Sequence, residues 1–494
     1  MIVTLPHLKN ISDMTGPSRA PDYNPDNHKA GIVHLGIGAF HRAHQAVMTD
    51  DALARNGGDW RIIAVSLRSR ELAERLNAQN GLYTLIERGP SGTSARVIAA
   101  IKNVIAADAA ATLKTLCDPA IRIVTLTVTE KGYGIDHESH MPDESNPIVA
   151  ADLKSPHTPS GVLGLLVEAL KRRRTKDCQP LTIMSCDNLP DNGALLRDGV
   201  VGFSRMSGAD ELADWIKDNI AFPSSMVDRI TPASTTETFA EAQKQTGCDD
   251  QAAVEAEPFL QWVIEDNFAS GRPAWEAGGA KFVRDVMPYE RMKLTVVNGP
   301  QSMMAYAGFL AGCDYVRDAM ADMDLSILVH RHLNTAAGLL SPLSGVDMDQ
   351  YVSALLERFA NPAIAHATYQ IAMDGSQKLP QRIFQPAIKS LETKGDIRPF
   401  SLVTAMWIRF CMRRRDDGSV YELQDPRADE IIAAIDSAGQ NASDIARAIH
   451  KLPQLIPTRL GSDPAWIEAV ENALSNALNE GCRAAVQKEA ARRR

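Results

Sequence analysis

With 494 residues, the chain is long enough for two or three domains with substantial cores. Its content of 45% hydrophobic and 23% charged residues is that of an ordinary soluble globular protein. The net charge is −9 and the basic residues form no long stripe, so the sequence argues against a nucleic acid as partner.

The N-terminal residues lack the pattern of a signal peptide, and no apolar run is long enough to cross a membrane. The seven cysteines are widely scattered and include no Cys-x-x-Cys pair. We therefore expect free thiols in a reducing cytoplasm, no membrane partner and no metal site built on cysteine.

The first half of the chain has the pattern of an α/β fold. Residues 1–29 are rich in Pro, Asn, Asp and Ser and predict an irregular lead-in, after which apolar runs alternate with helical segments. This alternation predicts a doubly wound, mostly parallel sheet. The predicted strands are 32–35, 61–67, 121–129 and 181–185, and the predicted helices are 42–56 and 161–174.

After about residue 285 the strand signals fade, and helical segments separated by Gly or Pro follow one another. These segments are 301–322, 324–339, 348–359, 400–414, 428–438, 442–451 and 464–490. The sequence therefore predicts an N-terminal Rossmann-like domain over residues 1–285 and an all-helical C-terminal domain over residues 286–494.

A short glycine motif lies between the first predicted strand and the first predicted helix. Gly36-x-Gly38 in this position brings a dinucleotide pyrophosphate to a helix N-terminus, with Ala39 and Phe40 as the next residues. We expect these four residues to bind the cofactor. The third position of the usual fingerprint is His41, so a Gly-x-Gly turn without a nucleotide stays open as the alternative.

The end of the second predicted strand lacks the acidic residue that would bind an adenosine ribose. Arg68-Ser-Arg70 stands there instead, and we expect Arg68 to contact the cofactor. Arginines in this place suit a 2′-phosphate, so NADP stays open beside NAD. His41 and His44 are three residues apart, but no third ligand is near in sequence, and we predict no metal.

The segment Lys293-Leu-Thr-Val-Val-Asn298-Gly-Pro-Gln301 is the strongest catalytic signal in the chain. On an α-helix Asn298 would lie about 140° and Gln301 about 80° round from Lys293, so one broad face could hold all three. A lysine on an apolar wall loses solvation, its pKa falls, and it can act as a general base. An amide nearby can donate to an oxygen that gains charge.

The local sequence argues against one regular helix through this segment. The β-branched run at 295–297 and Pro300 favour a kink or a new start near Gly299. Taken alone, the segment could also be a snorkelling lysine followed by a capping asparagine.

Several segments together resemble one family, the polyol-specific long-chain dehydrogenases that include mannitol 2-dehydrogenase and mannonate oxidoreductase (fructuronate reductase). Besides the Lys293 segment they are Gly36-Ile-Gly-Ala-Phe-His-Arg-Ala-His-Gln45, Thr127-Val-Thr-Glu-Lys-Gly-Tyr133, Ser185-Cys-Asp-Asn-Leu-Pro-Asp-Asn-Gly193, Met226-Val-Asp-Arg-Ile-Thr231, Glu257-Pro-Phe-Leu-Gln-Trp262 and Asp374-Gly-Ser-Gln-Lys-Leu-Pro380. The resemblance runs from about residue 30 to about residue 430, in the family's order and with similar spacing.

The resemblance implies a metal-independent hydride transfer between NAD and a secondary alcohol of a linear sugar alcohol or sugar acid. It implies a general base at Lys293, oxyanion-holding amides at Asn298 and Asn188, acids for proton passage at Glu130 and Glu290, and substrate-hydroxyl contacts at Asp228 and Lys378. A small-molecule substrate is a further expectation from the resemblance. The oligomeric state stays open, and a monomer is favoured because many members of the family are monomeric.

Two positions depart from the family pattern. Gln301 stands where the family has histidine; it can donate one N–H to a carbonyl oxygen but cannot carry charge. Gln370 stands where mannitol-type members have arginine, and the surrounding stretch is more similar to the mannonate oxidoreductase branch.

With these departures, the sequence is compatible with three hypotheses for the function. Fructuronate and mannonate are the expected substrate pair, with Arg382 or Lys378 as the cation for the carboxylate. Mannitol 2-dehydrogenase is the alternative, and a cofactor-binding protein without strong catalysis is a third reading.

Overall fold

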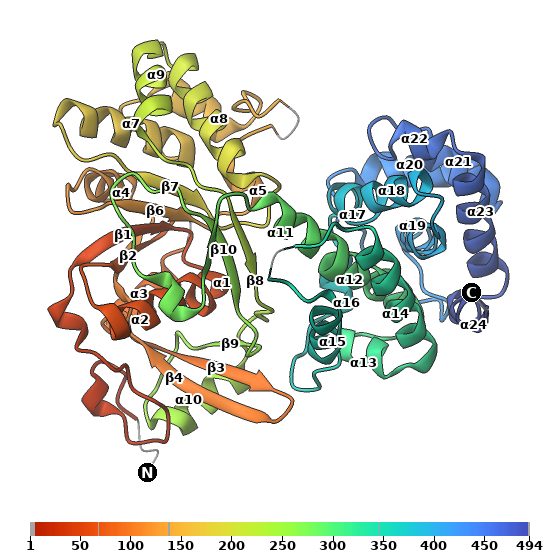
Figure 1. Cartoon of the computed structure of the whole chain (residues 1–494), viewed down its shortest axis with the longest axis horizontal. Coiled ribbons are helices and arrows are strands. Elements are labelled where there is room, and N and C mark those ends of the chain that lie inside the picture. The colour runs from red at the N-terminus through yellow and green to blue at the C-terminus, as the bar shows by residue number, and fades with distance from the viewer. Residues whose placement is uncertain (1–4, 68, 137–138, 344, 493–494) are drawn as a thin grey trace. The chain divides into compact units, whose positions relative to one another are not determined.

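The computed structural model describes residues 5–67, 69–136, 139–343 and 345–492. The chain forms two units, Met1–Met287 and Pro288–Arg494 (Figure 1). The sequence places the boundary at 285/286, and each unit is described by itself.

The first unit is built on a five-stranded parallel sheet with the strand order β5-β2-β1-β6-β7. Its strands are β1 Ala30–Leu35, β2 Arg61–Ser66, β5 Ile101–Ala106, β6 Ile123–Leu126 and β7 Thr182–Ser185. The order reverses between β1 and β6, which is the switch point where open α/β sheets bind ligands. The predicted doubly wound parallel sheet is confirmed.

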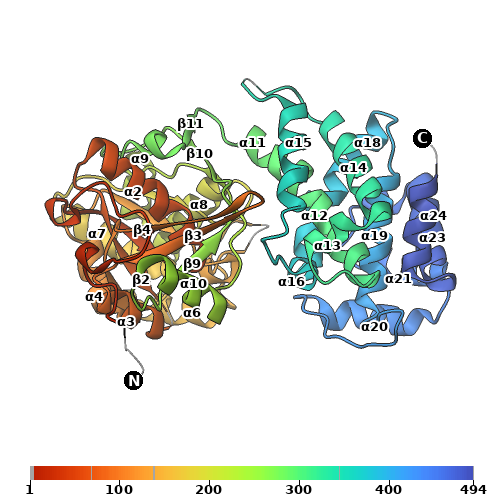
Figure 2. The same ribbon diagram turned by 90° about the horizontal axis from the view of Figure 1, so that it is seen from below.

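Helices cover both faces of this sheet (Figures 1 and 2). The helices of the first unit are α1 Ala39–Ala43, α2 Gln45–Asn56, α3 Glu71–Ala78, α4 Ala109–Leu116, α5 Glu130–Tyr133, α6 Pro147–Lys154, α7 Val162–Thr175, α8 Asn192–Met206, α9 Asp210–Asn219 and α10 Thr236–Thr246. Side chains of α4, α7, α8 and α9 form the core on one face, and those of α2 and α3 contribute to the core on the other.

Along each strand of the main sheet, side chains point alternately into the two cores. Val33 and Leu35 of β1 lie in the first core, whereas Ile32 lies in the second. Because neighbouring residues of a strand point to opposite faces and both faces are covered, the strands appear in the sequence as short apolar runs. This is why sequence periodicity predicts β1, β2, β6 and β7 correctly.

Two three-stranded sheets, with the strand orders β4-β3-β9 and β11-β10-β8, complete the first unit. Their strands are β3 Tyr83–Gly89, β4 Gly92–Ile98, β8 Ser225–Asp228, β9 Val254–Ala256, β10 Gln261–Glu265 and β11 Lys281–Val283. Short 3₁₀ helices lie at Ile11–Asp13, Pro25–Asn27 and Trp275–Gly278. The sequence analysis does not predict these small sheets or β5, because the strands are short or partly exposed.

In the part that the structure describes, the second unit consists of helices and their connections, with isolated β-bridges that pair Tyr315 with Ala367 and Arg414 with Val420. Its helices are α11 Met287–Met292, α12 Gly299–Met303, α13 Val316–Ala321, α14 Met323–Gly338, α15 Met348–Phe359, α16 Thr368–Ala372, α17 Gly375–Leu379, α18 Gln385–Glu392, α19 Arg398–Cys411, α20 Ala428–Ala438, α21 Ala442–His450, α22 Thr458–Gly461, α23 Pro464–Asn479 and α24 Cys482–Ala491. Three π-helical turns interrupt them, at Lys293–Asn298, Met304–Gly308 and Pro380–Phe384. Every residue of α19 from Pro399 to Cys411 is buried, so the other helices pack around it.

The predicted helical half is confirmed, and its details differ at glycines. The single helix predicted over 464–490 is two helices, because Gly481 adopts φ +88° between them. The segment predicted over 301–322 is likewise interrupted, with Gly312 at φ +93°. The helices between residues 368 and 392 are not predicted from sequence.

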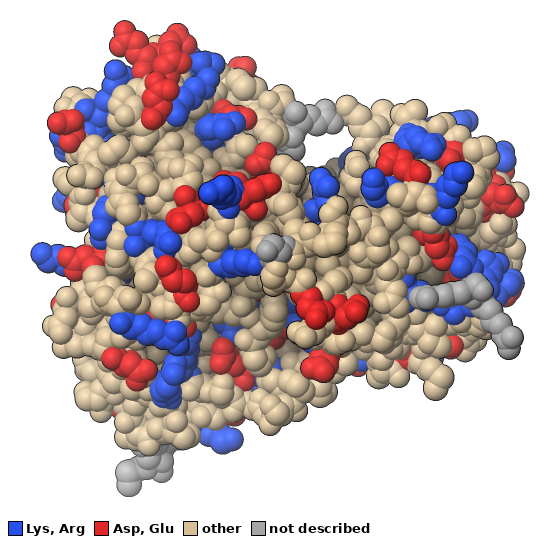
Figure 3. All heavy atoms as spheres, viewed as in Figure 1, with Lys and Arg blue, Asp and Glu red and all other residues tan. Residues whose placement is uncertain are grey.

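The basic run at 171–174 has a structural use. Arg173 is buried and donates to the carbonyls of Leu116, Asp118, Ile121 and Gln179 at 2.7–3.1 Å. On the face shown in Figure 3, Lys and Arg side chains are interspersed with Asp and Glu in small groups.

All seven cysteines lie in described parts of the chain and are free thiols, as predicted. Within the residues that the structure describes, no helix has the length and hydropathy needed to span a bilayer.

Candidate active site

The glycine loop follows β1 directly. The Gly36 N–H donates to the Val65 carbonyl at 2.9 Å, and Gly36 has φ +99°. A Cβ at this position would lie 2.1 Å from the Thr127 carbonyl oxygen. Only glycine fits here, because any side chain would meet both a disfavoured backbone conformation and the neighbouring main chain.

Gly38 is a glycine for a different reason. A Cβ built on Gly38 would have only the Gly36 carbonyl nearby, at 3.9 Å, so the space above it is open. The helix α1 begins at the next residue, Ala39. An open approach to a helix N-terminus is what a dinucleotide pyrophosphate needs, since backbone N–H groups there face the phosphates.

A cavity of about 360 Å³ opens at this loop, at the carboxyl ends of β1, β2 and β6. Its lining includes Gly36, Ile37, Gly38, Ser66, Leu67, Ser69, Thr127, Val128 and Thr129. The cavity therefore lies at the switch point of the sheet, and the residues around it fit a dinucleotide.

The residue that replaces the third fingerprint glycine packs against β1. His41 of α1 stacks on His34 of β1 with ring centroids 3.4 Å apart and ring planes 12° from parallel. Both side chains are fully buried. Two flat rings lying face to face let α1 approach the strand closely, which is the packing that a third glycine normally allows.

His34 also holds the loop in place. Its Nε2 lies 3.1 Å from the Gly36 carbonyl oxygen, and its Nδ1 lies 2.8 Å from the Thr125 hydroxyl. Nε2 also lies 2.9 Å from the Thr127 hydroxyl, which donates to the same Gly36 carbonyl at 2.7 Å. Because both of these neighbours can then only accept, Nε2 carries the proton and Nδ1 accepts from Thr125. Burial lowers the pKa of His34 to about 3, opposed by the hydrogen bond to Gly36, so the ring is neutral near neutral pH. Burial, followed by the neighbouring His34, keeps the pKa of His41 well below its usual value.

The loop after β2 contains the predicted arginines. Arg68 lies outside the described residues, and Arg70 is exposed at the N-terminus of α3. The hydroxyl of Ser66 donates to the Ser69 carbonyl and closes this loop beside the cavity.

Asp187 joins the two catalytic loops predicted in the first unit. Its carboxylate accepts from the backbone N–H groups of Val128 at 2.8 Å and Thr129 at 3.3 Å, and from the Tyr133 hydroxyl at 2.7 Å. The next residue after Thr129 is Glu130, which begins α5 and whose side chain lies outside the described part. Asn188 is exposed beside Asp187, so one carboxylate fixes the backbone of both loops.

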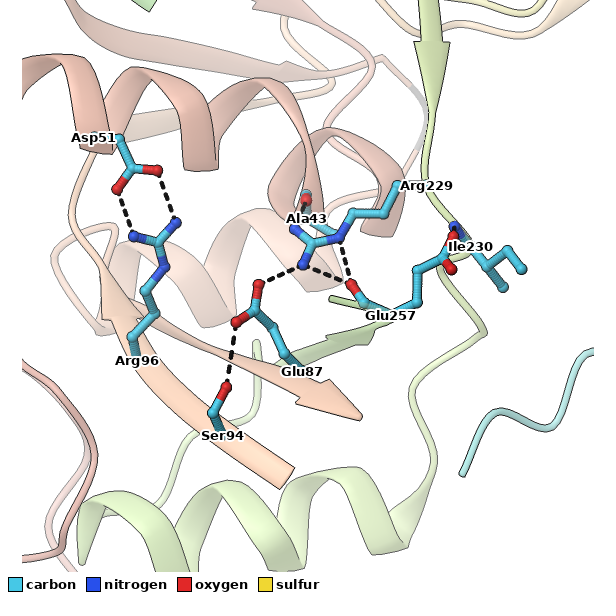
Figure 4. Close-up of polar contacts among 8 residues, drawn as sticks. All are labelled: Ala43, Asp51, Glu87, Ser94, Arg96, Arg229, Ile230 and Glu257. Atoms are coloured by element: carbon cyan, nitrogen blue, oxygen red, sulfur yellow. Dashed lines mark hydrogen bonds and ion pairs between the residues drawn. The ribbon is translucent and has the colours of Figure 1, made fainter. Parts of the chain in front are cut away.

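The predicted substrate contact Asp228 is the last residue of β8 and is 7% exposed. The next residue, Arg229, forms its ion pair with Glu87, at 2.6 Å (Figure 4).

In the second unit the predicted base lies in a π-helical turn. Lys293 is 7% exposed and Asn298 is 5% exposed, at the two ends of the turn Lys293–Asn298. The Gly299 N–H donates to the Leu294 carbonyl, a step of five residues instead of four. Residues five apart lie nearly above one another in such a turn, so Lys293 and Asn298 share a face more closely than the predicted α-helical spacing allows.

The helix changes type where the sequence predicts a new start. α-Helical geometry resumes at Gly299, with Pro300 as its second residue and Gln301, half-buried, as its third. Glu290 is half-buried in the preceding helix α11.

A second π-helical turn, Pro380–Phe384, packs against the first. It contains Arg382, which is buried, and a Cβ on Gly299 would lie 3.2 Å from the Arg382 carbonyl oxygen. The structure therefore brings Arg382 into the neighbourhood of Lys293 and Asn298.

Lys378 lies one turn before Arg382, in α17. Its ammonium donates to the Met373 carbonyl at 2.7 Å and lies 3.9 Å from the Asp374 carboxylate. A Cβ on Gly375 would lie 2.5 Å from the Trp407 ring, so this turn needs its glycine. Gln370 is exposed in α16.

Comparison with known proteins identifies the family. The Mannitol dehydrogenase Rossmann domain matches residues 30–277, and the Mannitol dehydrogenase C-terminal domain matches residues 285–477. This chain belongs to the mannitol dehydrogenase family. It is therefore an oxidoreductase family member, as the resemblance in its motifs predicts.

Relatives match over almost the whole chain. D-mannonate oxidoreductase of Escherichia coli K12 is 38% identical over 97% of this chain and 99% of its own length. The uncharacterized oxidoreductase YeiQ of the same organism is 40% identical over 98% of each chain. The solved ternary complex of Pseudomonas fluorescens mannitol 2-dehydrogenase with NAD and D-mannitol has a TM-score of 0.89 at 34% identity, covering 98% of this chain and 99% of that one.

Two residues that organise this mannitol dehydrogenase family site are missed by sequence reasoning. Asp187 stands two residues after the buried strand β7, and polar residues at that end of a parallel sheet face the ligand crevice, which is a signal that could have found it. His34 has no such signal, because in the sequence it is one residue of an apolar strand.

We expect the two loop glycines to differ in a substitution experiment. Gly36→Ala should lower the unfolding temperature and abolish NADH binding, since the φ and the Thr127 contact cost about 1–3 kcal/mol or more. Gly38→Ala should unfold like the wild type yet bind NADH about tenfold more weakly, because its methyl occupies phosphate space. Thermal unfolding and isothermal titration with NADH check both, and wild-type NADH affinity in Gly38→Ala would contradict a cofactor site at this loop.

We also expect His34 to contribute to acid sensitivity. The unfolded chain protonates this histidine below its ordinary pKa of 6.5, whereas the folded state resists protonation down to about 3, so stability is lost as the pH falls through that window. Between pH 6.5 and pH 5 the loss is about 2 kcal/mol.

Urea unfolding of the wild type and His34→Asn at pH 7 and pH 5 measures this contribution. The variant should lose less stability between the two pH values, and a uniform destabilisation of the variant cancels in the comparison. Equal losses in both proteins would show that His34 titrates normally in the fold.

Proposed function

We propose that this protein is an NAD-dependent oxidoreductase that interconverts a linear 2-keto sugar acid and its alcohol, with fructuronate and mannonate as the pair. The observation that carries the proposal is the buried Lys293, five residues before Asn298 in a π-helical turn and beside the turn that contains Arg382.

Lys293 acts as the general base in the direction of alcohol oxidation. The carbon–hydrogen bond can release hydride only as the hydroxyl proton leaves, so a base must stand at the hydroxyl. Lys293 is 7% exposed, in a turn whose Val296 and Val297 are also buried, and loss of solvation favours the neutral amine that a base needs. A nicotinamide dinucleotide bound at the glycine loop supplies or accepts the hydride.

Asn298 and Asn188 donate to the substrate oxygen as it gains negative charge, and Gln301 donates in place of the family histidine. These neutral donors stabilise the negative charge on the substrate oxygen, as a metal ion does in other alcohol dehydrogenases. Glu290 and Glu130 take the proton from the base towards solvent. Gln301 cannot exchange a proton, so the acids carry this part of the reaction alone.

The sugar portion is bound by polar groups of both signs. Asp228 accepts from substrate hydroxyls, and Lys378 donates to them. Arg382 pairs with the carboxylate of a sugar acid, because a guanidinium offers two parallel N–H donors to two carboxylate oxygens. Gln370 in place of an arginine favours this choice over mannitol, and D-mannonate oxidoreductase is among the relatives, at 38% identity.

NAD is the proposed cofactor, supported by the NAD complex of the similar Pseudomonas fluorescens mannitol 2-dehydrogenase. Arg70 at the N-terminus of α3 favours a 2′-phosphate and keeps NADP as the alternative. We further propose a monomeric enzyme of the cytoplasm, where seven free thiols stay reduced.

Lys293→Ala tests the proposed chemistry. Loss of a general base costs about 10²–10⁴-fold in turnover, whereas NADH binding should change less than about twofold, because the glycine loop is untouched. Steady-state kinetics with fructuronate and NADH, together with NADH titration, separate the two effects. Lys389→Ala, an exposed lysine of α18, is the matched control. Turnover that survived in Lys293→Ala would overturn the assignment, and turnover abolished by it would dispose of the non-catalytic reading.

The substrate assignment is tested by offering fructuronate and fructose side by side. We expect faster reduction of fructuronate, and a loss of about 10–100-fold in kcat/KM for fructuronate in Arg382→Ala, since a charge-assisted pair contributes about 1.5–3 kcal/mol. Fructose has no carboxylate, so its reduction should change less in the same variant. A wild-type preference for fructose would make mannitol 2-dehydrogenase the better assignment.

A further inference from the structure

Arg229 is a fully buried arginine next to the proposed substrate contact Asp228. Its guanidinium donates to the Glu257 carbonyl from Nε at 2.9 Å and from Nη2 at 2.7 Å, to the Ala43 carbonyl at 2.5 Å and to the Glu87 carboxylate at 2.6 Å (Figure 4). Arg229 therefore connects three segments of the first unit that lie far apart in the sequence.

Glu257 also exchanges hydrogen bonds with Ile230, the residue after Arg229. The Glu257 carboxylate is 1% exposed and accepts from the Ile230 N–H at 2.7 Å, while the Glu257 N–H donates to the Ile230 carbonyl at 3.1 Å. Side-chain and main-chain hydrogen bonds therefore hold the chain after β8 against the chain after β9. These bonds connect the two small sheets and fix the position of Asp228 at the end of β8.

The contact with Ala43 fixes the other end of the site. Ala43 is the last residue of α1, a helix of five residues that starts directly after Gly38. Such a helix is only about 7.5 Å long, so a shift at its C-terminal end moves its N-terminal end as well. The carbonyl before Ala43, that of Arg42, accepts from the buried Tyr83 hydroxyl at 2.6 Å.

The Glu87 carboxylate balances the buried positive charge of Arg229. Burial lowers the pKa of Arg229, opposed mainly by Glu87, and a guanidinium keeps its proton in proteins. Removing the carboxylate would leave a buried cation with carbonyl partners only, which weakens its hold.

We propose that Arg229 is a positioning residue that sets the glycine loop and α1 relative to Asp228, and so aligns the cofactor-binding loop with the substrate-binding aspartate. The part of this inference that concerns Asp228 rests on the proposed function. The part that concerns the loop rests on the Ala43 contact alone.

Arg229→Lys tests the inference, with Arg96→Lys as the matched control. Lysine keeps the charge but cannot hold Ala43, Glu257 and Glu87 at once. Arg96 lies in β4 of the same region and forms a two-pronged pair with Asp51 of α2, at 2.5 and 3.1 Å, without touching the last residue of α1 (Figure 4). A general loss of packing should affect the two variants alike.

We expect the NADH dissociation constant, measured by isothermal titration, to rise at least about tenfold in Arg229→Lys and less than about twofold in Arg96→Lys. Equal NADH affinity in the two variants would overturn the inference. If Arg229→Lys does not fold, Glu87→Gln against Asp51→Asn decides in the same way, with a rise of about threefold expected only in Glu87→Gln.

A double-mutant cycle tests whether Arg229 also positions Asp228. Arg229→Lys should raise KM for the sugar in the wild-type background but not in an Asp228→Asn background, because residues that act through one another are not additive. Additive changes in KM would show that Arg229 does not act through Asp228. NADH affinity is measured without turnover, so the loop part is decided even if Lys293→Ala shows that the proposed function is wrong.

Discussion

Pro300 has no N–H, and this single missing donor shapes the proposed catalytic turn. In an α-helix the Val296 carbonyl would meet the N–H of residue 300, and the proline ring would crowd it. The chain widens to five-residue steps over Lys293–Asn298 and returns to α-helical geometry at Gly299. Because π-helical turns bring residues five apart towards one face, the proposed base Lys293 and the amide of Asn298 lie on the same side of this turn.

The same arrangement occurs a second time in this unit. The π-helical turn Pro380–Phe384 ends two residues before Pro386, as Lys293–Asn298 ends two residues before Pro300. The two turns pack against each other, and the small Gly299 lets the first approach the Arg382 carbonyl closely. A proposed base and a proposed carboxylate partner are thus held by the same backbone irregularity, used twice.

Sequence reasoning predicts the elements whose burial makes a regular pattern and misses those that lack one. Four parallel strands of the main sheet, β1, β2, β6 and β7, are predicted because both of their faces are covered, whereas the partly exposed edge strand β5 is missed. Strand β4 begins with exposed Gly, Thr and Ser and has no apolar alternation. The site residue types are predicted from motifs, but not the contacts that place them. Arg229 reaches Ala43 across 186 positions of sequence, and Asp187 reaches Val128 across 59. No local pattern specifies such pairs, since only the completed fold brings their strand ends together.

The two histidines at the glycine loop show how a departure from a fingerprint can keep its physical purpose. A third glycine would permit close packing of helix on strand, and the stacked rings of His34 and His41 permit it too. The stack requires neutral rings, because two imidazolium charges at 3.4 Å would repel in a buried site. Burial supplies that neutrality, and the Gly36 carbonyl fixes the tautomer. The loop therefore depends on the exclusion of water beneath it as much as on its glycines.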